Sequence, residues 1–262
     1  MIKFKDNKRN CKKNWRVLKF SEENGFMNMA IDEAILNARI KGLVPNTLRF
    51  YSWNPSCISI GYFQSVEKEV DLEKAKDLGV NVVRRITGGG AVFHEKELTY
   101  SIFLSEKDAS RDIVESYRNI CSGIIYGLGF LGLNAEFKPI NDIVVDNKKI
   151  SGNAQTRRDG VILQHGTILL DVDVKKMFSL LKVPDEKIKD KLISSVEERV
   201  TSLKKILGKD IKPEVLRELL INGFEQAFNA HFEERELTKF EIELAKKLFK
   251  EKYSKKYWNF LR

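Results

Sequence analysis

The sequence of 262 residues contains few of the residues that build disulfide frameworks and metal sites. It has three cysteines and three histidines, and no two cysteines stand in a CxxC arrangement. The cysteines (Cys11, Cys57 and Cys121) are odd in number and far apart. We therefore expect neither a disulfide scaffold nor a structural zinc site. A reducing cytoplasm is the simplest compartment for such a chain.

Long apolar runs are also missing from the sequence. No stretch approaches the roughly 18 residues that a membrane span requires, so we expect no membrane partner. The basic N-terminus, MIKFKDNKRNCKKNW, has no apolar core behind it and does not resemble a secretory signal. The hydrophobic content of 42% and the charged content of 32% are typical of a globular protein.

Acidic residues are fewer than basic ones, and the formal net charge is +9. A lysine-rich solvated surface explains this value, and an acidic partner, either a nucleic acid or a protein, is the alternative. The lysines alternate with glutamates, as in VEKEVDLEKAKD, and no basic stripe with interleaved aromatic residues is present. We therefore expect no nucleic-acid partner.

Strand and helix patterns alternate along most of the chain, and Asp146-Asn147 is a good hairpin turn between two strands. The hairpin signals predict an α+β fold with a mixed or antiparallel sheet packed with helices. We expect a basic tail at 1–14 and a single domain at 15–262 that is mostly helical from about residue 174. Strands are expected at 15–20, 47–53, 57–63, 80–85, 91–94 and 97–104, and helices at 26–42, 66–79 and 111–131.

Three consecutive glycines, 88–90, stand in the stretch RRITGGGAVFH. The spacing fits neither a dinucleotide-binding GxGxxG motif nor a Walker loop. Glycines let backbone N–H groups approach a ligand closely, and successive free N–H groups bind anions. Arg85, two residues before Thr87, could clamp a phosphate or a carboxylate. A glycine-rich turn with the arginine in water, and a strand-end role for His94, are the alternatives.

Two further stretches carry chemistry-bearing side chains. In PINDIVVDNKKISGNAQ, Asn141 and Asp142 could bind a nucleotide or Mg²⁺, and Lys149 could neutralise developing negative charge. The alternatives are a turn and a solvated hairpin tip. In VILQHGTILLD, alternation places His165 and Thr167 on one face with three apolar residues. This face is either an ordinary core strand or one wall of an apolar acyl tunnel.

Seven segments in this order resemble the lipoate–protein ligase A and octanoyltransferase family, which is related to biotin protein ligases. The resemblance runs from about Trp15 to the C-terminus and implies the catalytic-domain fold of that family. The segments are MNMAIDEAIL, RFYSWNPSCISIGYFQ, VVRRITGGGAVFH, ELTYSI, KPINDIVVDNKKISGNAQ, QHGTILLD and RVTSL.

The resemblance implies a reaction in which lipoate or octanoate and MgATP give an acyl-adenylate. A lysine of a lipoyl domain of a 2-oxoacid dehydrogenase E2 subunit, or of a glycine-cleavage H protein, then takes the acyl group. Lys149 corresponds to the family's catalytic lysine, and Asp142 to a metal ligand. The implied binding residues for the acyl-adenylate are Arg85, Thr87, Gly88, Gly89, Gly90, Ala91, His94, Asn141, Ser151, Gly152, His165 and Thr167. An apolar, dry pocket suits a hydrolysable anhydride with a medium-length acyl chain.

The octanoyltransferases of the family take octanoate from acyl carrier protein through a cysteine just upstream of the Lys–Ser–Gly strand, without ATP. This chain has EFKPINDIVV there, and no cysteine follows Cys121. We therefore expect an ATP-dependent lipoate–protein ligase. The alternative is a transferase in which the target lysine attacks the acyl donor directly.

Many ligases of the family carry an additional C-terminal domain for which this sequence has no room, so a separate small accessory protein is an expected partner. A lipoate-binding regulator is a further alternative, but the residues before Trp15 are too few for a helix-turn-helix module.

Overall fold

The computed structural model describes residues 13–182 and 188–262. Most of the basic tail expected at 1–14 lies outside these residues, as does Cys11. The described chain begins directly with a strand, β1 (Lys13–Leu18), in which the residues from Trp15 onward are buried. No described helix is both long enough and apolar enough to cross a membrane.

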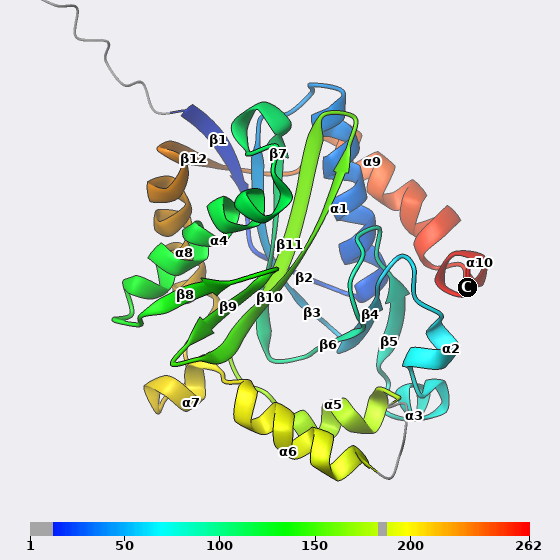
Figure 1. Ribbon diagram of the computed structural model, residues 1–262. Helices are drawn as coiled ribbons and strands as arrows, with labels where there is room; N and C mark the ends of the chain where they lie inside the picture. The colour runs from blue at the N-terminus through cyan, green and yellow to red at the C-terminus, as the bar shows by residue number, and fades with distance from the viewer. Residues whose placement is uncertain (1–12, 183–187) are drawn as a thin grey trace, which may run out of the picture.

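A nine-stranded sheet lies at the centre of the molecule, in the order β12-β1-β3-β7-β11-β10-β9-β8, with β2 also paired to β3 (Figure 1). The pairs among β12, β1, β3 and β2 are parallel, and the others are antiparallel. The sheet is mixed, so the predicted α+β class is confirmed. Its remaining strands are β2 (Ser21–Glu23), β3 (Thr47–Trp53), β7 (Glu97–Ser105), β8 (Ala135–Lys138), β9 (Asp142–Val145), β10 (Lys148–Arg158), β11 (Val161–Leu169) and β12 (Ala230–Arg235).

The predicted hairpin turn joins β9 to β10. Asp146 and Asn147 have φ angles of 49° and 61°. Two consecutive positive φ values suit a two-residue turn whose twist matches that of the flanking strands, and asparagine and aspartate tolerate this conformation. The turn places Lys149 near the start of β10, where the register shifts between Lys149 and Ser151.

Helices cover both faces of the sheet, so its central strands β7 and β11 are buried on both sides along nearly their whole length. In Figure 1, α4 (Ile113–Gly129) and α8 (Pro213–Phe228) lie on one side, and α1 (Gly25–Ile40) and α9 (Lys239–Leu248) lie on the other. Side chains of α4 and α8 share one core with the sheet, and those of α1 and α9 share a second.

Three glycines let α4 and α8 cross closely. A Cβ added to Gly223 would lie 2.2 Å from the carbonyl oxygen of Gly123 and 2.4 Å from the amide nitrogen of Gly127. Such contacts are far inside van der Waals distance, so no side chain fits at this crossing.

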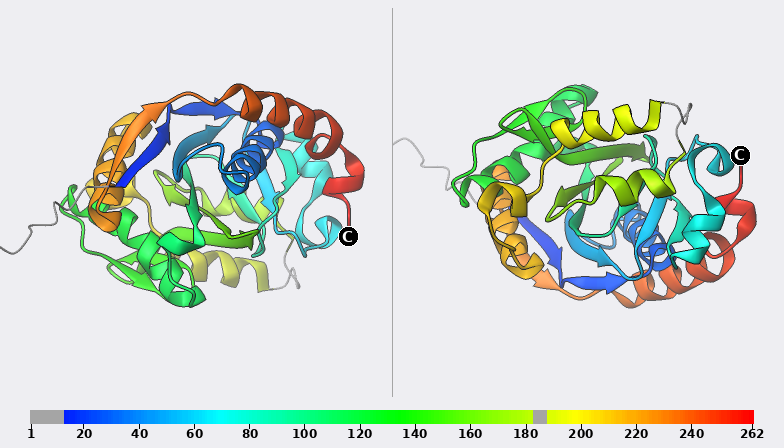
Figure 2. Two further views of the ribbon diagram at one scale, coloured as in Figure 1. Left: turned by 90° about the horizontal axis from the view of Figure 1, so that it is seen from above. Right: turned by 90° about the horizontal axis from the view of Figure 1, so that it is seen from below.

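A second sheet of three strands, in the order β5-β4-β6, stands beside the large one. Its strands are β4 (Cys57–Ile60), β5 (Asn81–Arg84) and β6 (Val92–His94). Two helices, α5 (Val174–Leu180) and α6 (Lys189–Arg199), lie at the lower end of the molecule in Figure 1, and the view from below shows them in front of the sheets (Figure 2). The short helices are α2 (Val66–Glu69), α3 (Leu72–Asp77), η1 (Glu106–Asp108), α7 (Leu203–Leu207), η3 (Phe249–Tyr253) and α10 (Lys256–Asn259).

Two elements differ from the sequence predictions. The helix expected at 66–79 is broken into α2 and α3, because Val70 is extended and bridges to Leu181 while Asp71 caps α3. The region expected to be mostly helical from residue 174 also holds a strand, β12. It pairs in parallel with β1 and buries Ala230 and Phe232. Residues 183–187 of the region expected to be mostly helical lie outside the described chain.

Candidate functional site

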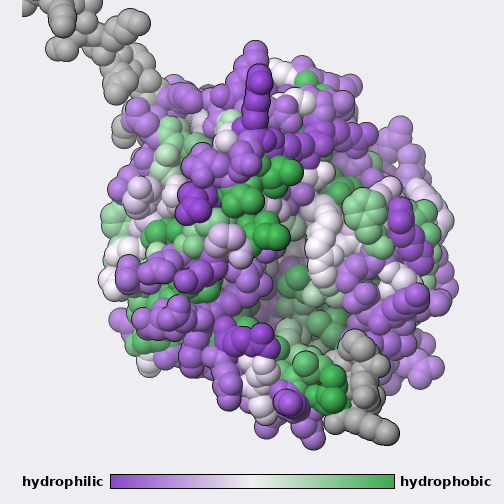
Figure 3. Space-filling view, viewed as in Figure 1, coloured by the Kyte–Doolittle hydropathy of each residue, from purple (hydrophilic) through white to green (hydrophobic). Residues whose placement is uncertain are grey.

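A cavity of about 360 Å³ opens between the two sheets. Strands β7, β10 and β11 form one wall, β4 and β6 form another, and α5 and α6 lie across it. In the space-filling view its mouth is a hollow with apolar residues along one rim (Figure 3). The apolar lining comes from Met29, Val92, Phe93, Leu169, Val174, Met177, Val196 and Val200. This lining suits an acyl chain, because each buried CH₂ group contributes about 0.8 kcal/mol.

Arg85 lies beneath the glycine loop, with 4% of its surface exposed. Its Nη2 donates to the carbonyl oxygens of Gly88 and Gly90 at 2.8 and 2.7 Å. The backbone at Gly89 has φ = 95°, which favours glycine, and an added Cβ there would lie 2.9 Å from that same Nη2. Burial lowers the pKa of Arg85 to about 10, so the guanidinium stays charged at neutral pH.

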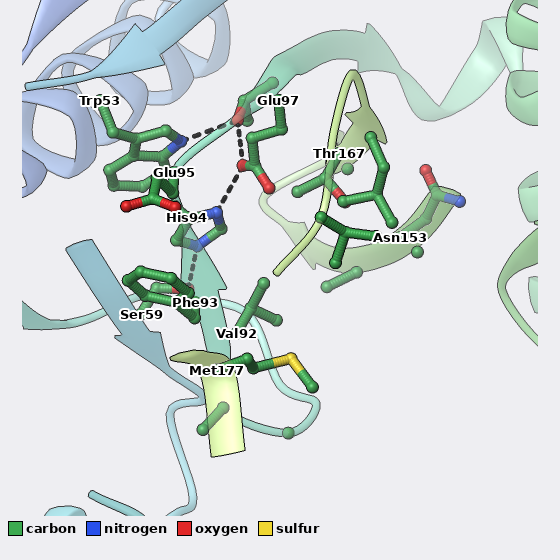
Figure 4. Close-up of a pocket in the computed structure, with 18 of the residues that line it drawn as sticks. Trp53, Ser59, Val92, Phe93, His94, Glu95, Glu97, Asn153, Thr167 and Met177 are labelled. Carbon is green, nitrogen blue, oxygen red and sulfur yellow. Dashed lines mark hydrogen bonds and ion pairs between the residues drawn. The ribbon is translucent and has the colours of Figure 1, made fainter. Parts of the chain in front are cut away.

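Next to Arg85, His94 takes part in a chain of buried polar groups (Figure 4). Its Nδ1 lies 2.6 Å from Glu97 Oε1, and its Nε2 lies 2.7 Å from Ser59 Oγ. The ring of Trp53 stacks on the imidazole, with centroids 4.1 Å apart, and the indole N–H donates to Thr99. The carboxylate and the stacked ring fix the orientation of His94.

His165 takes part in a second chain of the same kind. Its Nε2 lies 2.7 Å from Thr87 Oγ1, and its Nδ1 lies 3.6 Å from Asp32 Oδ2. Burial lowers the pKa of His165 and outweighs the opposing effect of Asp32. Burial alone would raise the pKa of Asp32, but Arg49, 2.7 Å away, and His165 lower it overall. At neutral pH this places a neutral imidazole beside an ionised aspartate.

Lys149 reaches the cavity from β10. Its Nζ lies 2.6 Å from Asp142 Oδ1, and both side chains are partly exposed. A Cβ on Gly152 would lie 3.0 Å from Lys149 Nζ, so this glycine leaves room for the folded lysine side chain. A flexible ammonium group at the rim of an apolar cavity can approach charge that develops on a bound carbonyl.

Asn141 and Asn153 brace β9 against β10. The side-chain amide of Asn141 donates to the carbonyl of Asn153, and that of Asn153 donates to the carbonyl of Asn141 at 2.8 Å. Asn153 Oδ1 accepts a bond from Tyr100 at 2.7 Å. Ser151 is fully buried, and its Oγ accepts a bond from the side-chain amide of Asn153 at 3.4 Å. These bonds hold the strand that carries Lys149.

Most of the residues that the sequence analysis singled out lie together. The cavity is lined by Arg85, Gly89, Gly90, Ala91, His94, Asn141, Lys149, Gly152, His165 and Thr167. Thr87, Gly88, Ser151 and Asp142 are not part of the lining but each contacts a residue that is. Their roles toward a ligand stay predictions.

The buried partners of the two histidines were not predicted from the sequence. Glu97, Thr99 and Ser101 recur at every second position of β7, and all three are buried. On α1, Asn28 and Asp32 are four residues apart in an otherwise apolar stretch. Such periodic polar residues inside apolar elements indicate a buried polar network, and they were the available signal.

Neither cysteine within the described residues lines the cavity. Cys57 and Cys121 are fully buried. Burial raises the pKa of Cys57 well above its usual value and that of Cys121 to about 12. Both side chains are therefore held as thiols, which are poor nucleophiles.

No cluster of three or more histidine, cysteine, aspartate or glutamate side chains able to hold a metal is found among residues 13–182 and 188–262. Asp142, the expected Mg²⁺ ligand, offers a single carboxylate that is paired with Lys149. The Mg²⁺ and ATP assignments stay predictions.

The fold is that of lipoate–protein ligases of known structure. A bi-partite lipoate protein ligase of Thermoplasma acidophilum, described with its E2 lipoyl domain, matches with a TM-score of 0.86 and 35% identity, over 95% of this chain and 98% of that one. The chain belongs to the lipoyl protein ligase A/B catalytic domain family, whose model matches residues 24–225. The resemblance seen in the sequence is thus confirmed.

Curated relatives carry the name Octanoyltransferase LipM. The protein of Anoxybacillus flavithermus is 39% identical over 95% of this chain and 98% of its own length. That of Bacillus subtilis is 34% identical over 96% and 99%.

These names overturn the expectation of an ATP-dependent ligase. That expectation rested on the absence of a cysteine at the position where the octanoyltransferases of the family carry one. An amine can attack a thioester directly, so the missing cysteine does not exclude an acyltransferase. What is established is an enzyme of the lipoate ligase and transferase family.

Proposed function

We propose that this protein is an acyltransferase of protein lipoylation. It moves an octanoyl group from the thioester of an acyl carrier protein to a lysine of a lipoyl domain or of a glycine-cleavage H protein, and consumes no ATP. The observation that carries the proposal is the similarity, over nearly the whole chain, to proteins named octanoyltransferase.

The cavity supports this proposal in its shape and lining. Apolar side chains of β6, α5 and α6 offer a dry surface for the octanoyl chain. The glycine loop and Lys149 offer hydrogen-bond donors and a positive charge at the polar part of the cavity. Donors placed in a cavity shielded from water stabilise the oxygen of a tetrahedral intermediate more strongly than water does.

The transfer proceeds without a covalent enzyme intermediate. The ε-amine of the acceptor lysine forms a bond to the thioester carbonyl carbon, and the carbon–sulfur bond breaks. The proton lost by the amine ends on the released thiolate of the donor, so a thioester and an amine become an amide and a thiol. Lys149 stabilises the transient oxyanion, and the enzyme returns unchanged.

The test is an incubation of the full chain with octanoyl-acyl carrier protein and a lipoyl domain, without nucleotide, followed by mass analysis of the acceptor. The proposal expects the acceptor to gain one octanoyl group. A parallel reaction with free octanoate and MgATP is the control. Modification in that reaction alone would overturn the proposal.

A second measurement addresses the direct attack. The chain is incubated with octanoyl-acyl carrier protein alone, quenched with acid, and its intact mass is recorded. Direct transfer predicts an unchanged mass. A gain of one octanoyl group would show an acyl-enzyme. Ser59 would then be mapped first, because its Oγ lies 2.7 Å from His94 Nε2.

A further inference from the structure

Arg85 is a buried cation whose hydrogen bonds all go to uncharged groups. Its Nε donates to Thr87 Oγ1 at 3.2 Å, and its Nη1 donates to the carbonyl oxygen and the Oγ of Ser59 at 2.9 and 3.0 Å. Its Nη2 binds the two loop carbonyls. Within the described chain, no carboxylate lies within 4.0 Å of its nitrogens.

Each of the two hydroxyl groups that accept a hydrogen bond from Arg85 also contacts a histidine, and each histidine lies next to a carboxylate. One relay is Ser59–His94–Glu97, and the other is Thr87–His165–Asp32. In both, the carboxylate lies at Nδ1 and the hydroxyl at Nε2. A carboxylate at Nδ1 favours the tautomer that carries its proton there. The unprotonated Nε2 then accepts a hydrogen bond from the hydroxyl group. The lone pairs of the hydroxyl oxygen stay free to accept hydrogen bonds from Arg85.

The relays reach Arg85 from separate parts of the fold. Asp32 comes from α1, His165 from β11, Ser59 from β4, His94 from β6 and Glu97 from β7. All five residues are at most 8% exposed. Arg85 therefore joins the small sheet to the large one at the floor of the cavity, and its position depends on both relays.

The position of Arg85 determines the form of the glycine loop. Its guanidinium holds the carbonyls of Gly88 and Gly90, and a Cβ on Gly61 would lie 2.0 Å from the carbonyl oxygen of Gly89. All three loop carbonyls thus face the protein. The amide groups of these glycines have no acceptor within the described chain, so they stay available to a ligand oxygen.

We propose that the two relays are positioning devices, and that His94 and His165 act through Arg85 to hold the glycine loop in its ligand-binding form. The inference rests on the proposed function only in the choice of acyl ligand. Neither histidine serves as the base of the transfer, because each Nε2 is already used by a hydroxyl that in turn supports Arg85.

The test compares His94→Leu and His165→Leu with His165→Gln and with His231→Leu. Leucine removes the acceptor for the hydroxyl, whereas the glutamine side-chain oxygen can replace Nε2. The third histidine, His231, is exposed and binds Glu225, so His231→Leu is the matched control. The folded state of each variant is checked by thermal unfolding before kinetics.

If the relays position the loop, each leucine variant should raise the KM for octanoyl-acyl carrier protein by about tenfold or more, with a smaller change in kcat. The reason is that the loss of one buried hydrogen bond costs roughly 1.4 kcal/mol or more. His165→Gln should raise KM less than His165→Leu. Adding Thr87→Val to His165→Leu should change little further, because both act in one relay. Wild-type KM in folded leucine variants, or a fall in kcat alone, would overturn the inference.

A binding measurement distinguishes a failure of this inference from a failure of the proposed function. The affinity for octanoate is measured by calorimetry on the same variants. A wild-type chain that binds octanoate but transfers nothing would contradict the proposed function, while weaker octanoate binding by the leucine variants would still support the relays. Equal octanoate affinity in the wild type and in the folded leucine variants would overturn the positioning role of the relays, whether or not transfer occurs.

Discussion

Lys149 lies where β10 shifts register, and its ammonium group extends over Gly152 toward the cavity. Replacing it with alanine should lower the rate of octanoyl transfer by about 10² or more, the loss typical for removing a donor that stabilises an oxyanion. Its side chain is 41% exposed, so the free energy of unfolding should change by less than about 1 kcal/mol.

The neighbouring lysine is a matched control. Lys148 is exposed at the hairpin and lies outside the cavity lining, so Lys148→Ala should transfer at the wild-type rate. Steady-state kinetics and denaturant unfolding of both variants check this prediction. Equal rates for the two alanine variants would contradict the assigned role of Lys149.

His165 gives the molecule a stability that depends on pH. Burial lowers its pKa in the folded state, so below about pH 6.5 the unfolded chain binds the proton more readily than the folded chain. The contribution is fully present above that pH and is lost as the pH falls toward the folded-state pKa. Asp32, Arg85 and His94 are the charged or titratable groups that act on it.

Denaturant unfolding of the wild type and of His165→Gln at pH 7.5 and about pH 5.5 measures this effect. The wild type should lose more stability than the variant between the two pH values. The same loss in both proteins would show that His165 does not titrate in this window.

At the scale of elements, the crossing of α4 and α8 depends on glycines. Gly223→Ala would place a methyl group 2.2 Å from the carbonyl of Gly123, so the helices must separate. We expect a loss of about 1–3 kcal/mol or more in the free energy of unfolding, the usual cost of overpacking. Gly129→Ala, near the end of α4 and with no atom within 4 Å of the added Cβ, should be nearly neutral. A stable Gly223→Ala variant in denaturant unfolding would show that the crossing is looser.

Elements with strong periodicity could be predicted from the sequence. The turn at Asp146-Asn147 and the amphipathic helix that became α1 are local properties, and both are present. Strand β12 could not be predicted, because its six residues are mostly polar and its pairing partner, β1, is more than 200 residues away in the chain. Val70 ended a predicted helix through a bridge to Leu181, which is also a tertiary contact.

The candidate site was predictable where residues cluster in sequence. Gly89, Gly90, Lys149 and His165 stand in conspicuous stretches, and they line one cavity. The partners Asp32 and Glu97 were not found, because a carboxylate in a helix or at a strand end is normally solvated. Their contact with the histidines depends on how α1 and β7 pack, which no local pattern encodes.

At the scale of the whole molecule, the net charge of +9 has a testable effect. If the net charge serves an acidic acceptor, which is the alternative to a merely solvated lysine-rich surface, electrostatic attraction should accelerate the encounter with that acceptor. Raising the salt concentration from about 0.05 to 0.5 M should lower kcat/KM for a lipoyl domain by roughly tenfold. A small uncharged amine used as acceptor should show little change. Equal salt effects on both acceptors would contradict steering.

The proposed acyl transfer requires neither ATP nor a cysteine. The most direct test is the initial rate of octanoyl transfer from acyl carrier protein to a lipoyl domain, without nucleotide, by wild type and by a variant with Cys11, Cys57 and Cys121 all replaced by alanine. With folding of the variant verified, we expect both proteins to transfer the octanoyl group at comparable rates. A folded variant that has lost transfer, or a wild type that works only when MgATP is added, would contradict it.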